Sequence, residues 1–136
     1  MEKKYKHQDW EEKIYRQWKK SSVFKARPES KKSPFCIIMP PPNANAPLHI
    51  GHAMFLTIED IMARYARMQG KEVLLLPGAD HAGILTQVVF EKKLQKEGKS
   101  RYDLKRNKFY RQCLKFTLDN KKVMFKQTAK MGVSCD

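Results

Sequence analysis

Residues 34–52 read PFCIIMPPPNANAPLHIGH, and this stretch carries the strongest fold signal in the chain. Its first six residues, 34–39, form a short apolar run next to proline, which is typical of a strand buried in a parallel sheet. The prolines at 40–42 end that strand, because proline lacks the amide donor that a central strand needs. A loop through Leu48 then leads into a helix that we expect from Gly51 to Met68.

A second strand and helix follow the first pair. The run EVLLLP at 72–77 predicts a second buried strand, residues 78–83 a loop, and Ile84–Glu97 a second helix. Gly70 and Gly98 stand where a helix terminator is expected. The order strand–helix–strand–helix favours an α/β unit with parallel strands and a right-handed crossover.

The predicted helices carry apolar side chains at helical spacing. In the helix from Gly51 to Met68 we expect one buried face, formed by Met54, Ile58, Ile61, Met62 and Tyr65. A further amphipathic helix is predicted from about His7 to Lys20, with its stripe packed on the rest of the protein. The motif Ser100-x-x-Asp103 has the form of a helix N-cap, and the residues after it are expected to be largely helical.

Composition limits the classes of function. The 136 residues carry 28 basic and 14 acidic side chains, a net charge of +14. Such a field attracts polyanions such as nucleic acid or nucleotide phosphates, although solvated surface lysines would give the same total. The N-terminus lacks the apolar segment of a secretory signal, and no apolar run is long enough to span a membrane. Three widely spaced cysteines predict neither a disulfide partner nor a metal site, which fits a cytoplasmic location.

The first strand-ending loop carries two histidines, His49 and His52, at the entry to the long helix. A helix N-terminus presents unpaired amides and a positive dipole end, which suits phosphate. Gly51 between them removes a side chain where a flat base or a phosphate must come close. Surface solvation, helix capping or a metal site remain alternatives for a pair of histidines, although no third ligand stands nearby unless Asp80 or His81 supplies it.

The second strand-ending loop reads GADHAG at 78–83. The carboxylate of Asp80 at the end of a strand is well placed to bind an ammonium group. The alternative is an ordinary N-cap aspartate for the following helix.

Four strings taken together resemble the class I aminoacyl-tRNA synthetases. They are PPN at 41–43, LHIGHA at 48–53, RYxRMQG at 64–70 and GxDHAGIxTQ at 78–87. Within that class the last string looks like the valyl enzymes, since isoleucyl and leucyl relatives usually lack its HAGI run. The segments around Trp10 and at 131–136 resemble the valyl pattern too, so the likeness covers nearly the whole chain. Where the family commonly has Thr-Gly before the histidine motif, this chain has Asn45-Ala46, which raises the question of a glycine-dependent turn.

The resemblance implies a fold and a division of the chain. Residues 1–136 would form the N-terminal part of the catalytic domain, the first half of a Rossmann-like nucleotide-binding domain. An N-terminal helix and loop would occupy 1–33, the β-α-β-α half 34–98, and a helical segment 99–136 leading toward a missing editing insertion. The second signature of the family, a lysine-serine loop, is absent, so we expect a fragment or a truncated gene product that is weakly active or inactive alone.

The resemblance also implies an activity and its cofactors. The expected reaction is ATP-dependent activation of valine and its transfer to valine tRNA, with Mg²⁺ bound along with ATP rather than in a protein cage. His49 and His52 would be catalytic and would hold the ATP phosphates in the transition state. Gly51 would lie against the adenine, and Asn43 would border the nucleotide.

The amino-acid side of the implied site rests on three residues. Asp80 would hold the substrate ammonium, while Pro41 and Pro42 would line the valine side-chain pocket. Three other functions stay open: a synthetase for isoleucine or leucine, a small adenylyltransferase with a similar His-x-Gly-His loop, and a basic nucleotide- or RNA-binding module without turnover. The adenylyltransferases have that loop very near the N-terminus and lack the GxDHAG string, which argues against them.

Overall fold

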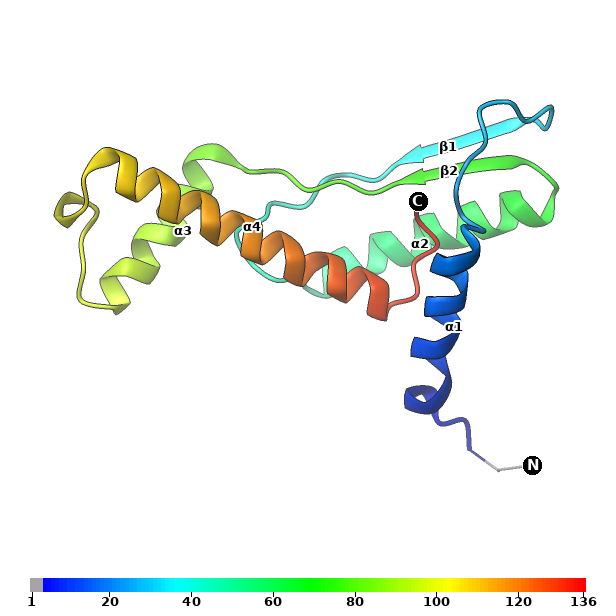
Figure 1. Cartoon of the computed structure of the whole chain (residues 1–136), viewed down its shortest axis with the longest axis horizontal. Helices are drawn as coiled ribbons and strands as arrows, with labels where there is room; N and C mark the ends of the chain where they lie inside the picture. Colours follow the sequence, from blue (N-terminus) through cyan, green and yellow to red (C-terminus); the bar gives the residue numbers. More distant parts are fainter. Residues whose placement is uncertain (1–3) are drawn as a thin grey trace. The chain divides into compact units, whose positions relative to one another are not determined.

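The computed structural model describes residues 4–136, which form helices joined to a small parallel sheet (Figure 1). The elements are α1 (His7–Ser21), β1 (Pro34–Ile38), α2 (Ile50–Met68), β2 (Glu72–Leu76), α3 (Gly83–Lys96), the 3-10 helix η1 (Arg101–Asp103) and α4 (Arg106–Lys130). The chain divides into two compact units. The sheet unit holds the chain up to Pro40, residues 50–77 and residues 128–136, and the helical unit holds residues 41–49 and 78–127.

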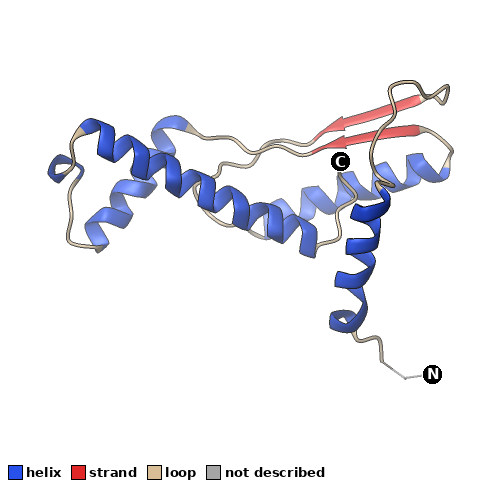
Figure 2. Ribbon diagram, in the orientation of Figure 1, coloured by secondary structure: helices blue, strands red, loops and turns tan. Residues whose placement is uncertain are grey.

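In the sheet unit, β1 and β2 pair in parallel over their whole length (Figure 2). Pro34 pairs with Glu72 at one end and Ile38 with Leu76 at the other. Helix α2 connects the two strands and packs on both of them. The predicted α/β unit with parallel strands is therefore confirmed, with each strand one residue shorter than expected.

The burial of the strands differs from the prediction. In β2 the side chains of Val73 and Leu75 are buried, and Leu76 is exposed. In β1 no side chain is buried, and Ile38 is 72% exposed. The expectation of a buried strand was wrong for β1, because α2 covers only one face of a two-stranded sheet and a strand alternates its side chains between faces.

Helix α2 buries a different face from the one predicted. Its buried residues are Leu56, Ala63 and Ala66, whereas the five predicted core residues are all exposed. Ile61, for example, keeps 60% of its surface. Alanine lets the helix axis come close to the sheet, so the small side chains pack inward, and the row of large apolar side chains lies on the opposite face.

Helix α1 is held to the sheet unit through its C-terminal end. The ring of Trp18 packs edge-on against Phe24 at 5.2 Å between centroids, and the guanidinium of Arg64 lies 5.2 Å from the Trp18 ring. Arg67 lies 4.9 Å from the Phe24 ring in the same way. The predicted apolar stripe of α1 comprises Trp10, Ile14 and Trp18. Its packing is confirmed at Trp18 and is wrong at Trp10 and Ile14, which stay exposed.

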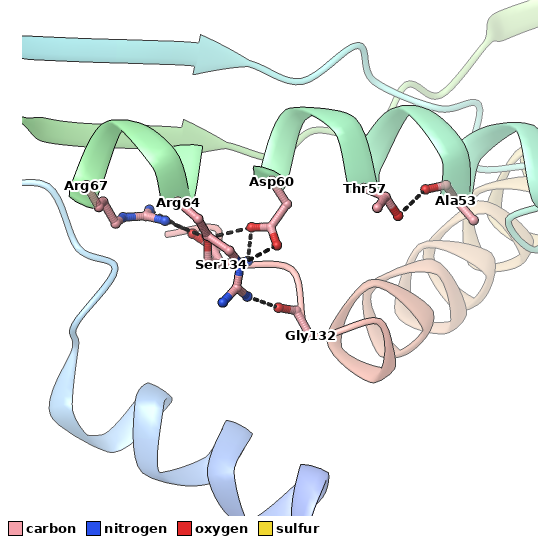
Figure 3. A network of polar contacts seen from close by, with 7 residues as sticks. All are labelled: Ala53, Thr57, Asp60, Arg64, Arg67, Gly132 and Ser134. Carbon is pink, nitrogen blue, oxygen red and sulfur yellow. Dashed lines mark hydrogen bonds and ion pairs between the residues drawn. The ribbon is translucent and has the colours of Figure 1, made fainter. Parts of the chain in front are cut away.

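A polar network joins α2 to the end of the chain (Figure 3). Asp60 accepts hydrogen bonds from the amide and the hydroxyl of Ser134 and from Nε of Arg64. Arg64 also donates to the carbonyl of Gly132, and Arg67 donates to the hydroxyl and the carbonyl of Ser134. Asp60 is only 13% exposed, and burial lowers the pKa of Arg67. The RYxR string therefore has a structural task in this unit.

The helical unit has its own core, built by α3 and α4. Phe90 of α3 packs against Phe109 and Phe116 of α4, with ring centroids 5.6 Å apart in both pairs. Phe90, Leu94 and Met124 are buried. The predicted second helix and the helical C-terminal segment are confirmed.

The capping motif Ser100-x-x-Asp103 caps a different helix from the one expected. Its capping box caps the N-terminus of η1. The Ser100 hydroxyl accepts from the amide of Tyr102, and the carboxylate of Asp103 accepts from the Ser100 amide. The long helix α4 begins three residues after Asp103. Gly70 and Gly98 do end their helices with positive φ, as predicted.

Candidate functional site

The two strand-ending loops lie side by side in the helical unit. Asn43 and Asp80 form a parallel bridge. The amide of Asp80 donates to the carbonyl of Pro42 at 2.9 Å, and the amide of Ala44 donates to the carbonyl of Asp80 at 2.7 Å. This bridge brings together four of the predicted site residues, namely Pro41, Pro42, Asn43 and Asp80. The side chains of Asp80, Asn43 and Pro41 are exposed, so a ligand can reach them.

Asp80 does not cap helix α3. The N-cap residue of that helix is Ala82, in the left-handed conformation with φ 55, and it makes no side-chain capping bond. The loop is held instead by Thr86, which is buried and donates its hydroxyl to the carbonyl of His81. The alternative interpretation of Asp80 as an N-cap is therefore wrong. A carboxylate without that structural task stays available for a cationic ligand.

The left-handed conformation of Ala82 is unusual for a residue with a side chain. It is followed by Gly83 with φ 42, so two successive residues turn the chain between β2 and α3. Strained backbone of this kind is concentrated at functional sites. Ala46, by contrast, is not among the residues with positive φ in the described chain, so the turn before the histidine motif does not depend on glycine.

His49 follows a residue that is anchored from a distant part of the sequence. Oε1 of Gln127 accepts from the amide of Leu48 at 2.8 Å, and Nε2 of Gln127 donates to the carbonyl of Leu48 at 3.4 Å. Gln127 lies in α4, 79 residues away from Leu48. Sequence reasoning missed this residue, since nothing in the local pattern around a helical glutamine points to a loop so far away.

The remaining motif residues belong to the first turn of α2. Gly51 and His52 follow Ile50, the first residue of the helix, which confirms that the motif stands at a helix entry. His52 is half-buried, and its ring packs edge-on against Phe55 at 5.9 Å between centroids. The N-terminal end of a helix carries the positive end of its dipole, so this end of α2 is suited to an anion.

The described part of the chain offers no dedicated metal centre. Residues 4–136 contain no group of three or more histidine, cysteine or acidic side chains that could hold a metal ion. Cys36, Cys113 and Cys135 are free thiols, and burial raises the pKa of Cys113 and Cys135. Among the described helices, none is long and apolar enough to cross a bilayer.

The chain matches the model of one protein family, described as tRNA synthetases class I (I, L, M and V), over residues 13–136. It therefore belongs to the class I tRNA synthetases. The similar proteins that follow are all named as one enzyme within this class. It is 46% identical over 136 residues to the valine--tRNA ligase of Dehalococcoides mccartyi strain CBDB1, and 45% identical over 135 residues to that of Chlamydia pneumoniae. Over 126 residues it is 48% identical to the chloroplastic/mitochondrial valine--tRNA ligase 2 of Arabidopsis thaliana.

These relatives are much longer than the chain. The matches cover 100%, 98% and 93% of this chain but only 16%, 14% and 13% of the three relatives. A LeuRS of Agrobacterium radiobacter K84, solved in a ternary complex with tRNA and LeuAMS, has a similar fold. The TM-score is 0.78 at 23% identity, covering 97% of this chain and 15% of that one. The fold comparison thus supports the α/β prediction of half a Rossmann-like domain.

Proposed function

We propose that this chain supplies the first half of the active site of a valine–tRNA ligase. The observation that carries the proposal is the bridge between Asn43 and Asp80, because it joins the predicted amino-acid residues to a predicted ATP residue. The 43–48% identity to valine--tRNA ligases over 93–100% of the chain supports valine as the substrate. The chain covers about a sixth of such a protein, so the activity would belong to a longer enzyme.

In the proposed reaction, a carboxylate oxygen of valine attacks the α-phosphorus of ATP. A bond to that oxygen forms, the bond to the bridging oxygen of pyrophosphate breaks, and pyrophosphate leaves with its electron pair. The site must hold the two reactants in line and stabilise the charge that develops on phosphate. A hydroxyl at the 3′ end of valine tRNA then attacks the carbonyl carbon of the activated valine and loses its proton. The bond from that carbon to the phosphate oxygen breaks, and AMP leaves with its electron pair.

The amino-acid side of the site would be formed by the bridged loops. Asp80 would bind the ammonium of valine, since its carboxylate is exposed and does not cap α3. Pro41 and Pro42, on the strand of chain paired with it, would contact the aliphatic side chain. A charge-assisted bond and an apolar contact at fixed separation would select a small apolar amino acid.

The nucleotide side would be formed by the loop before α2 and the first turn of that helix. Asn43 would border the nucleotide, and Gly51 would lie against the adenine. His49 and His52 would donate to the phosphates as charge develops, and the positive end of the α2 dipole would favour the same anion. Mg²⁺ would be bound through the phosphates of ATP.

Two other functions remain as alternatives, and the experiment described below distinguishes them from the valine enzyme. The family includes enzymes for isoleucine and leucine, and an apolar pocket separates similar side chains only modestly. A nucleotide- or RNA-binding module without turnover would keep the fold but not the reaction. The sequence similarity favours the valine enzyme, with a cytoplasmic location as the proposed setting.

The test is amino-acid-dependent exchange of pyrophosphate into ATP. The chain replaces the matching segment of the Dehalococcoides mccartyi relative, and exchange by this chimera is measured with valine, isoleucine and leucine. Valine is expected to support exchange at a rate at least about tenfold above the other two. A folded chimera that prefers isoleucine or leucine, or that binds ATP without any exchange, would refute the proposal.

A further inference from the structure

One side of α4 carries a row of basic side chains. Its members are Lys108, Arg111, Lys115, Lys122 and Lys126, and all five are exposed. At 100° per residue, they lie within about 40° of Lys115 around the helix axis, so they share one face. The row extends over roughly 27 Å at 1.5 Å per residue. We name these five residues the basic face of α4.

The orientation of the basic face is set by packing on the other side of the helix. Phe109 and Phe116 contact Phe90 of α3, and Thr117 and Met124 are buried. These four α4 residues lie about 100–180° from Lys115 around the axis. The basic face therefore points away from the core of the helical unit.

The charge on this helix is nearly all of one sign. Its sequence contains eight basic residues and a single acidic one, Asp119, which lies about 40° from Lys115 on the same face and pairs with Lys122 at 3.4 Å. A helix that only needs solvation commonly mixes both signs, since acidic and basic residues four apart stabilise each other. A long row in which five cations outnumber one carboxylate instead raises the local potential and attracts a polyanion.

We infer that the basic face of α4 binds the phosphate backbone of an RNA. The choice of RNA rests on the proposed function, in which the second substrate is an RNA. A row of cations on a rigid helix can follow successive phosphates along a backbone, which needs no sequence readout. A lipid surface is the competing polyanion. A helix that lies on a membrane inserts its apolar face, whereas the rings of Phe109 and Phe116 in α4 are packed on Phe90.

The experiment measures binding of the 136-residue chain to a short RNA hairpin with a single-stranded 3′ end, without ATP or valine, across a salt series. The test variant is Lys115→Gln with Lys122→Gln, which keeps good helix formers at both positions. The matched control is Lys31→Gln with Lys32→Gln, two exposed residues of the α1–β1 loop that give the same change in net charge. A third variant, Lys115→Arg with Lys122→Arg, keeps the charge of the basic face.

The α4 double variant is expected to bind the RNA hairpin at least about tenfold more weakly than the original chain at 0.1 M salt. The slope of the logarithm of its binding constant against the logarithm of salt concentration should fall in magnitude by about two. The control and the arginine variant should stay within about threefold of the original chain. Circular dichroism checks that all the variants keep their helices. Equal losses in the α4 variant and the loop control would overturn the inference, because binding would then follow total charge. It would also be overturned by unchanged binding of the α4 variant.

Vesicles that contain anionic lipid provide the other arm. Dependence of vesicle binding, but not RNA binding, on Lys115 and Lys122 would contradict the RNA assignment. Because this assay contains neither ATP nor amino acid, its outcome is independent of pyrophosphate exchange. If the chimera shows no exchange while the chain binds RNA through Lys115 and Lys122, only the proposed ligase is refuted. If the chimera shows exchange while RNA binding does not depend on Lys115 and Lys122, only the RNA surface is refuted.

Discussion

The carboxylate of Asp60 in α2 accepts hydrogen bonds from both the amide and the hydroxyl of Ser134, 74 residues further along the chain (Figure 3). The hydrogen bond from the Ser134 amide to Asp60 is 2.7 Å long, and the same carboxylate also forms an ion pair with Arg64. Ser134 is fully buried, so its amide would have no water to replace a lost partner. We expect Asp60→Ala to lower the free energy of unfolding by about 2–3 kcal/mol, measured by denaturant titration.

The matched control for this prediction is Asp119→Ala. Asp119 pairs with Lys122 at 3.4 Å, but both side chains are more than half exposed, so the change should cost no more than about 0.5 kcal/mol. Similar losses in the two variants would mean that the buried network is not what stabilises the sheet unit.

The contact between Gln127 and Leu48 predicts an effect on catalysis through position. Gln127→Ala removes both hydrogen bonds to the backbone just before His49. In the chimera we expect the maximal exchange rate to fall by about tenfold or more, with the valine KM little changed, because the loop loses its anchor. Gln127→Glu keeps an acceptor for the Leu48 amide and should retain most of the rate. Equal losses in the two variants would argue against a positioning role.

Asp80→Asn is predicted to weaken the binding of valine and to leave the binding of ATP nearly unchanged. Replacing a carboxylate with an amide removes a charge-assisted bond to ammonium worth about 1.5–3 kcal/mol, or roughly 10- to 150-fold in valine affinity. The measurement is the valine and ATP dependence of exchange in the chimera. A fall in ATP affinity without a change for valine would show that the two loops have been assigned in the wrong order.

His52→Ala is predicted to give the opposite result. A histidine that acts on developing phosphate charge contributes to the transition state rather than to the ground state. We expect the maximal exchange rate to fall by about 10²-fold or more, while the valine KM stays within a few-fold. Comparable losses in rate and in valine affinity would contradict this role. Far-UV circular dichroism controls for the edge contact with Phe55 at the start of α2.

The exposed apolar row on α2 predicts self-association of the isolated chain. The row consists of Ile50, Met54, Ile58, Ile61, Tyr65 and Met68. An exposed apolar patch of this extent is a liability for a monomer. Sedimentation should therefore reveal association at micromolar concentration. Ile58→Lys with Ile61→Lys should reduce it without loss of helicity, whereas Leu56→Lys, at a buried position, should unfold the sheet unit. A chain that stays monomeric at high concentration would refute the prediction.

The elements themselves could be predicted from the sequence, because strand and helix periods are local properties. The apolar runs at 34–39 and 72–77 and the prolines after the first strand were enough to predict β1 and β2. The helix expected between them predicted their parallel order. The candidate site residues were also predicted from local patterns. The histidine motif lies at the entry to α2, and the proline-rich loop meets the loop of Asp80, as parallel strands require.

Only the tertiary structure decided which side chains are buried and which distant residues are paired. Apolar periodicity on α2 has two sides, and size rather than hydrophobicity selected Ala63 and Ala66 for the close approach to the sheet. The exposure of Ile38 depends on how many layers cover β1, which no strand pattern records. The partners of Asp60 and Leu48 lie 74 and 79 residues away, and a hydrogen bond between distant residues depends on the folded path of the chain rather than on either local sequence.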